Sequence, residues 1–191
     1  MHFDSIGFDL DGTLWDFTPT VQQAWAEVLQ AQGLIQLLPP VDAIRAYAGC
    51  TLTELAAIFP SLEQSKALEL TCACVAAEDR YTASVGGMLY DGLEEVLSAL
   101  SQNYRLFLAS NCMPGYLHGF LNKYCLNRYF DDAICYGDTN QPKGANIQTV
   151  IQRRGYRSTL FVGDTQSDYQ AACDARIPFA HAAYGLSLIH L

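Results

Sequence analysis

Short runs of apolar residues alternate along most of the chain with segments in which apolar residues recur every three or four positions. The runs predict five buried strands: Ser5–Leu10, Arg105–Ser110, Ala133–Tyr136, Thr159–Val162 and Pro178–Ala183. The periodic segments predict helices between them: Leu93–Ser101, Tyr116–Asn127, Asn146–Arg153 and Ser167–Ala175. Alternation of strand and helix is typical of a doubly wound, Rossmann-like α/β fold, so we expect a parallel sheet with helices on both faces.

The first interval breaks this alternation, because residues 11–104 separate the first two strands whereas a strand–helix–strand unit needs only about 30 residues. Four helical segments are predicted inside it: Thr20–Gln32, Val41–Tyr47, Thr51–Ile58 and Ser61–Thr82. The turn-rich stretches at Asp16–Pro19, where the chain leaves the sheet, and at Gly86-Gly87 and Asp91-Gly92, where it returns, are expected to act as a pair of hinges. We therefore expect two domains, an α/β core formed by residues 1–16 and 88–191 and an inserted helical domain formed by residues 17–87.

Composition and charge exclude several classes of protein. Of the 191 residues, 50% are hydrophobic and only 16% are charged, which is typical of a folded globular protein. Twenty acidic residues against eleven basic residues give a net charge of -9, which disfavours binding to nucleic acid or to an anionic membrane surface. The longest uncharged stretches fall short of the ~18–20 apolar residues of a membrane span, so we expect no membrane segment.

Cysteine content and the N-terminal residues indicate the cellular compartment. The seven cysteines show no repeating spacing that would indicate a disulfide framework. Asp4, Asp9 and Asp11 interrupt the first apolar run, which argues against a signal peptide. We expect a cytoplasmic protein.

Polar residues follow four of the predicted strands at their carboxyl ends, and in open α/β sheets this edge binds ligands. The residues are Asp9, Asp11, Thr13, Ser110, Asn111, Lys143, Asp164 and Asp168. Each acid alone is most often a turn or helix-capping residue, but several acids at one edge repel one another unless a cation balances them. A hard divalent cation with oxygen ligands meets that need, so we expect Mg²⁺. Together with Lys143 it would bind a phosphoryl group, which a neighbouring carboxylate could attack.

These residues also resemble the four motifs of the haloacid dehalogenase superfamily. Asp9-Leu10-Asp11-Gly12-Thr13-Leu14 is similar to its first motif, Ser110 to its second, Lys143 to its third, and Gly163-Asp164-Thr165 with Asp168 to its fourth. The resemblance covers nearly the whole chain and includes an insertion where the phosphatase branch, with its phosphoglycolate phosphatase-like and β-phosphoglucomutase-like members, has a helical cap domain. It implies a Mg²⁺-dependent phosphatase that hydrolyses a small phosphate monoester through an aspartyl-phosphate.

The resemblance also implies a role for each motif residue. Asp9 would be the nucleophile, and Asp11 would be the acid for the leaving alcohol and then the base for the hydrolytic water. The side chains implied to bind the phosphoryl group are Ser110, Asn111, Lys143 and Thr13. The groups implied to hold the metal are the carboxylates of Asp9 and Asp164 and the backbone carbonyl of Asp11. Asp168 would be either a further metal ligand or the partner of Lys143.

Other functions on the same fold stay open as alternatives. A β-phosphoglucomutase-like mutase uses the same motifs, and a catalytically silent binding module would keep the fold. Asp11 argues against a dehalogenase, which lacks the second acid of the first motif. A phosphonatase would need a lysine in the cap, for which Lys66 is the one candidate.

The helical insertion contains one candidate for substrate recognition. Arg45 precedes a turn containing Gly49 that resembles the substrate-specificity segment of the family, and we expect Arg45 to reach an anion of the substrate. Asp16 is expected to cap a helix rather than to bind metal. The expected partner is a small phosphate ester, and the expected assembly is a monomer or a homodimer.

Overall fold

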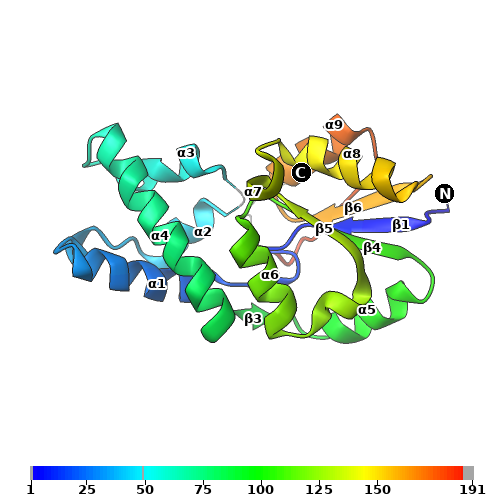
Figure 1. Cartoon of the computed structure of the whole chain (residues 1–191), viewed down its shortest axis with the longest axis horizontal. Coiled ribbons are helices and arrows are strands. Elements are labelled where there is room, and N and C mark those ends of the chain that lie inside the picture. Colours follow the sequence, from blue (N-terminus) through cyan, green and yellow to red (C-terminus); the bar gives the residue numbers. More distant parts are fainter. Residues whose placement is uncertain (1, 49, 187–191) are drawn as a thin grey trace.

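The sheet of the computed structural model, which describes residues 2–48 and 50–186, has five parallel strands in the order β5-β4-β1-β6-β7. The strands are β1 (Ser5–Phe8), β4 (Arg105–Ser110), β5 (Phe130–Cys135), β6 (Thr159–Gly163) and β7 (Phe179–His181). Since β1 lies at the centre, its two neighbours come from distant parts of the chain. The predicted doubly wound α/β fold is confirmed (Figure 1).

Both faces of the sheet are buried because alternate side chains of each strand point to opposite sides. From β4, Leu106 and Leu108 belong to the apolar core that contains Phe120, whereas Phe107 belongs to the one that contains Ile147. The helices α5 (Leu93–Ser101) and α6 (Pro114–Lys123) cover the first face, below the sheet in Figure 1. The helices α8 (Lys143–Arg154) and α9 (Gln166–Ala175) cover the second face, above it.

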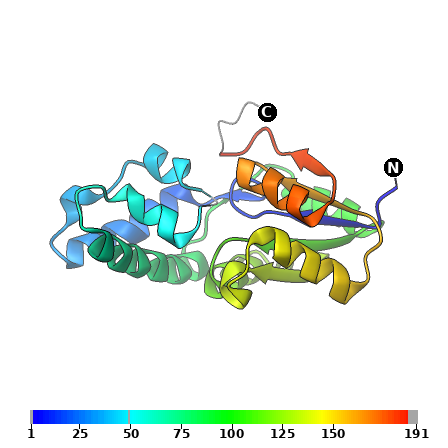
Figure 2. The same cartoon turned by 90° about the horizontal axis from the view of Figure 1, so that it is seen from above.

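The residues between β1 and β4 contain a group of helices that lies beside the sheet rather than on it (Figure 2). These helices are α1 (Thr18–Ala31), α2 (Val41–Ala46), α3 (Leu52–Leu55) and α4 (Gln64–Ser84). A buried stripe on α4 that includes Leu70, Cys74 and Ala77 shares a core with Trp25 and Leu29 of α1. The predicted helical insertion is therefore present, while the division into domains at residues 17–87 stays a prediction.

A second, two-stranded sheet forms where the chain leaves and re-enters the α/β part. In it, β2 (Trp15–Asp16) pairs antiparallel with β3 (Met88–Leu89). The segments predicted as hinges thus lie side by side, and their bending stays a prediction. Asp16 accepts hydrogen bonds from the backbone N–H of Thr18 (2.9 Å) and from its hydroxyl (2.5 Å), but the N-cap of α1 is Phe17, so Asp16 binds the first helical residue from one position before the cap.

Several element bounds differ from the sequence-based prediction for local reasons. The predicted helix Thr51–Ile58 is α3 followed by a 3-10 turn at Ala56–Ile58, and it ends before Phe59 because Pro60 disfavours helical geometry in the residue before it. The predicted helix Tyr116–Asn127 ends at Lys123, and a left-handed Cys125 (φ 54°) separates it from a 3-10 turn. The short helix α7 (Tyr136–Thr139) is not predicted. Within the described ranges, no helix is both long and apolar enough to span a bilayer.

Candidate active site

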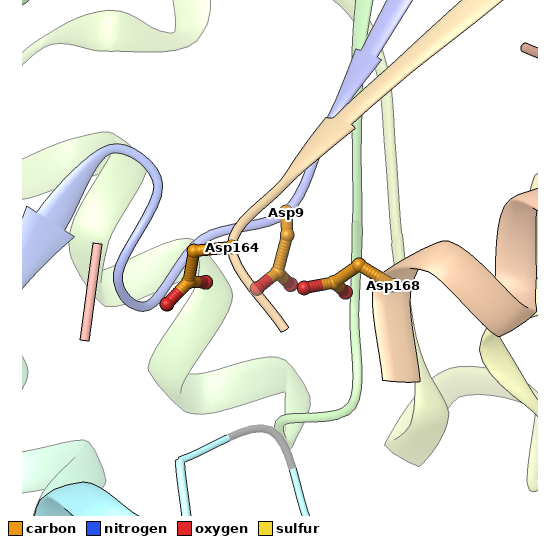
Figure 3. Close-up of side chains that lie close together, drawn as sticks. All are labelled: Asp9, Asp164 and Asp168. Atoms are coloured by element: carbon orange, nitrogen blue, oxygen red, sulfur yellow. The ribbon is translucent and has the colours of Figure 1, made fainter. Parts of the chain in front are cut away.

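Three buried carboxylates meet where β1 and β6 end. Asp9 directly follows β1, Asp164 directly follows β6, and Asp168 lies in the first turn of α9. Because β1 and β6 are parallel neighbours, their carboxyl ends lie at the same edge of the sheet. Figure 3 shows the three carboxylates pointing toward one another, and each offers an oxygen within 4.8 Å of the others.

Lys143 bridges two of these carboxylates from the first turn of α8. Its Nζ donates to Asp9 Oδ1 at 2.7 Å and to Asp168 Oδ1 at 2.6 Å, and all three side chains are buried. The helix predicted at Asn146–Arg153 begins earlier than expected, with Lys143 as its first residue. Burial lowers the pKa of Lys143, but the charges of Asp168 and Asp9 outweigh this effect and raise it overall. Lys143 is thus held as a cation at the base of the site.

Both oxygens of Asp168 already have protein partners. One accepts from Lys143, and the other accepts from the backbone N–H of Thr165 at 2.9 Å and from its hydroxyl at 2.7 Å. Thr165 in turn accepts from the backbone N–H of Asp168 at 3.2 Å, which completes a capping box at the start of α9. Of the two roles expected for Asp168, this geometry favours the partner of Lys143 over a metal ligand.

The loop after β1 fits tightly around Asp164. The hydroxyl of Thr13 donates to Asp164 Oδ1 at 3.4 Å, and the backbone N–H of Leu186 donates to Oδ2 at 2.9 Å. Gly12 has a left-handed backbone (φ 78°), and a Cβ at this position would lie 2.2 Å from Asp164 Oδ2. Glycine at position 12 therefore lets the backbone after Asp9 approach the carboxylate of the neighbouring strand.

The donor set fits a divalent cation. Asp9, Asp164 and Asp168 are buried against the single ammonium of Lys143, which leaves an excess of negative charge. Burial and the charge of Asp168 hold the pKa of Asp9 well above its usual range, although Lys143 opposes this shift. A cation beside Asp9 and Asp164 would remove that penalty, and carboxylate and carbonyl oxygens are the donors that Mg²⁺ prefers.

Asp11 lies two residues after Asp9 and has a separate set of partners. Its Oδ1 accepts from the Tyr116 hydroxyl at 2.5 Å and from the Trp15 indole N–H at 3.0 Å. Burial raises the pKa of Asp11 to about 6 even though both hydrogen bonds oppose the shift. Asp11 can therefore exchange a proton close to neutral pH.

Tyr116 is a site residue that the sequence did not predict. It belongs to the first turns of α6 and is 105 positions from Asp11 in the chain, so no local spacing connects the two. Their contact depends on how α6 packs beside Trp15, whose ring centroid lies 5.6 Å from that of Tyr116. The one signal in the sequence was Trp15, the aromatic residue that directly follows the motif Asp9–Leu14.

A cavity of about 390 Å³ lies between the sheet edge and the helical insertion. Its floor includes Asp9, Asp11, Ser110 and Asn111, and its walls include residues of α1, α2 and α4. Of the predicted phosphoryl-binding residues, Ser110 and Asn111 thus face the cavity, Lys143 lies behind Asp9, and Thr13 contacts Asp164.

Arg45 has two carboxylate partners within the protein. Its guanidinium pairs with Asp16 at 3.2 Å and with Asp42 at 3.1 Å, and Arg45 is not among the described residues that line the cavity. Contact between Arg45 and a substrate anion therefore stays a prediction, and Gly49 of the same segment lies outside the described residues. Lys66 is exposed on α4 and does not line the cavity either.

Glu78 of α4 enters the cavity from the helical side and gives a prediction for stability. It accepts a hydrogen bond from the Trp25 indole N–H at 2.7 Å, and burial raises its pKa to about 8. The folded state thus favours the protonated carboxyl of Glu78. The free energy by which this protonated group stabilises the fold is lost as the pH rises from 4.5, the usual pKa of a glutamate, through about 8. Glu78→Gln is expected to flatten the fall in melting temperature of the metal-free protein across this range.

The exposed Glu69 of the same helix supplies the control for this experiment. Glu69→Gln is expected to leave the pH dependence of the melting temperature unchanged. Equal slopes for wild type and Glu78→Gln would contradict the raised pKa.

Comparison with known proteins connects this geometry to a family. The family model described as haloacid dehalogenase-like hydrolase matches residues 6–182. A phosphoglycolate phosphatase from Xylella fastidiosa is 30% identical over 199 residues, which cover 93% of this chain and 79% of that protein. One from Photobacterium profundum is 28% identical over 193 residues, which cover 94% of this chain and 83% of that protein.

Solved structures show the same fold. A predicted phosphoglycolate phosphatase from Haemophilus somnus 129PT superposes with a TM-score of 0.81 at 22% identity, covering 96% of this chain and 86% of that chain. A predicted phosphatase from Clostridium acetobutylicum superposes with a TM-score of 0.80 at 19% identity, covering 98% of this chain and 88% of that chain. At these identities, the likeness supports the fold alone.

Proposed function

Since this chain belongs to the haloacid dehalogenase-like hydrolase family and resembles its phosphatases, we propose that it hydrolyses a small phosphate monoester with Mg²⁺ through an aspartyl-phosphate. The observation that carries the proposal is the position of Asp9. It lies at the sheet edge, bonded to Lys143 at 2.7 Å and beside Asp164, and it lines the same cavity as Asp11.

In the first step, a carboxylate oxygen of Asp9 forms a bond to phosphorus while the bond from phosphorus to the ester oxygen breaks. Asp11 gives its proton to the departing alcohol oxygen. In the second step, Asp11 takes a proton from water, whose oxygen attacks the phosphorus and releases phosphate and the free carboxylate of Asp9. The pKa of Asp11 near 6 suits both transfers, because neither protonation state is strongly favoured near neutral pH.

The other residues of the site bind and orient. Asp9, Asp164 and the backbone carbonyl of Asp11 would hold Mg²⁺, which when bound supplies positive charge to the phosphoryl oxygens. Lys143 keeps Asp9 and Asp168 in place through hydrogen bonds of 2.7 and 2.6 Å. Ser110 and Asn111 lie at the cavity floor, where they would contact the phosphoryl group.

We also propose that residues 17–87 form a cap domain on a core of residues 1–16 and 88–191. Helices of this segment form one side of the cavity whose floor contains Asp9, so their closure would exclude water from the site. A cytoplasmic location and a monomeric or homodimeric state belong to the same proposal. The exposed position of Lys66 disfavours the phosphonatase alternative, which needs a lysine in the cavity.

Tyr116→Phe is expected to lower kcat about tenfold with KM nearly unchanged, because it removes the hydroxyl that orients Asp11. That hydrogen bond also lowers the pKa of Asp11, so its loss should extend the protonated form of Asp11 to higher pH. The measurement is the pH profile of kcat for wild type and variant. Tyr124→Phe is the control, because its hydroxyl bonds to Gly87 instead. A profile moved equally by both variants would contradict the orienting role of Tyr116.

Phosphate release from p-nitrophenyl phosphate and from a panel of metabolite esters, with Mg²⁺ or with EDTA, tests the proposed function. We expect turnover that needs Mg²⁺ and stops with EDTA. Interconversion of sugar phosphate isomers with a bisphosphate activator, without net phosphate release, would favour the mutase. A folded protein that binds Mg²⁺ but has neither activity would be a silent binding module.

A further inference from the structure

Resting on the proposed function, we propose that the alcohol part of the substrate carries no second negative charge and presents a hydrogen-bond donor, an ammonium above all, to Glu78. The proposal concerns the half of the cavity that faces the helical insertion. The phosphoryl group would occupy the other half, beside Asp9. The alcohol part of the ester therefore meets the side chains of α1, α2 and α4.

Charged groups in this half of the cavity are all acidic within the described chain. Glu78 and Asp79 line it, whereas no Lys, Arg or His is found among its described lining residues. The Asp79 carboxyl interacts with the backbone N–H of Tyr116, while its buried Oδ1 accepts no hydrogen bond from any described residue. A carboxylate on the substrate would therefore lose its hydration here without gaining a cation, while a donor group would find acceptors waiting.

Arg45 of the helical insertion has protein carboxylates as partners. Its two terminal nitrogens pair with Asp16 and Asp42, while its buried Nε has no hydrogen-bond partner among the described residues. Lys143 is likewise bridged by two carboxylates and lies behind Asp9. Both basic groups thus pair with protein carboxylates, and neither is among the described residues that line the cavity.

Aromatic side chains complete the environment of a donor or a cation. Trp25, Tyr47 and Tyr136 line the same cavity, and aromatic faces attract ammonium groups. Trp25 also donates its N–H to Glu78 Oε1 at 2.7 Å, which fixes the position of the carboxyl group. Near neutral pH the protonated form of Glu78 is favoured because burial raises its pKa to about 8. The charge of an ammonium ligand would lower this pKa, so that Glu78 releases its proton to solvent and its carboxylate pairs with the cation.

Three esters with the same two-carbon skeleton test the proposal: 2-phosphoglycolate, 2-hydroxyethyl phosphate and phosphoethanolamine. They differ in a carboxylate, a hydroxyl and an ammonium. We expect kcat/KM for phosphoethanolamine and for 2-hydroxyethyl phosphate to exceed that for 2-phosphoglycolate at least about tenfold. In Glu78→Gln the advantage of phosphoethanolamine over 2-hydroxyethyl phosphate should fall about tenfold, because the paired anion is gone. Glu69→Gln should leave both ratios unchanged.

Highest kcat/KM for 2-phosphoglycolate in the wild type would overturn the proposal. Its selective loss in Arg45→Ala would then assign the recognition to Arg45. The proposal would also be overturned if the ratio of kcat/KM for phosphoethanolamine to that for 2-hydroxyethyl phosphate were unchanged in a folded Glu78→Gln variant. Asp79→Asn repeats the measurement with the neighbouring carboxyl. Turnover of p-nitrophenyl phosphate distinguishes failure of this proposal from failure of the proposed function. If this ester is hydrolysed, the phosphatase activity stands whatever the ratios of kcat/KM among the three esters are. If no ester reacts, both proposals fail.

Discussion

Exchange of Lys143 for methionine is expected to lower the free energy of unfolding by about 3–5 kcal/mol and to abolish phosphate release. The ammonium is the shared partner of Asp9 and Asp168, and all three side chains are buried. Methionine has a similar length but no charge, so two carboxylates would stay buried without their cation. Chemical denaturation of the metal-free protein measures the loss.

The pH dependence of this loss identifies its electrostatic origin. Without Lys143, which lowers the pKa of Asp9, that pKa rises further, so the folded variant takes up protons as the pH falls. The destabilisation should therefore shrink toward acidic pH. Lys123→Met is the control, because Lys123 is exposed and donates only to the Ser84 carbonyl. A Lys143→Met variant as stable as this control would contradict the pairing.

Exchange of Asp9 for asparagine is expected to reduce phosphate release at least about 10⁴-fold while leaving the fold as stable as the wild type or more stable. The amide cannot form the bond to phosphorus. Yet burial and the charge of Asp168 raise the pKa of Asp9, which means that its ionised form costs the folded state free energy. Asparagine removes the charge and leaves Lys143 paired with Asp168.

Two measurements check this variant: phosphate release with Mg²⁺, and the melting temperature without metal. Added Mg²⁺ should raise the melting temperature of the wild type more than that of Asp9→Asn, because one carboxylate ligand is missing. Turnover within tenfold of the wild type would exclude Asp9 as the nucleophile. A clearly lower melting temperature without metal would contradict the cost of its charge.

The α/β core was predictable from the sequence because its strands are short apolar runs whose ends carry the polar residues. Asp9 and Asp164 follow their strands directly, and parallel strands bring such ends together. The sequence could therefore place the carboxylates at one edge. It also predicted Lys143 near that edge, but it did not predict that Lys143 is the first residue of α8.

The helical side of the cavity was less predictable because its contacts depend on packing between helices that are far apart in sequence. Tyr116 reaches Asp11 only through the docking of α6 beside Trp15. The position of Arg45 before a turn gave no sign of its pairing with Asp16 and Asp42, and its contact with a substrate stays a prediction. Glu78 had no signal at all, since a glutamate within a long helix is usually exposed.

The two-stranded sheet of β2 and β3 joins the two ends of the helical segment between them. Asp16 pairs directly with Met88, so the chain departs and returns at neighbouring points. A tight hairpin could join them without changing the register of β1 with β4 or β6. Because α4 packs on α6, replacing the helices, and with them the proposed selectivity for the alcohol, also requires a new cover for that surface of α6.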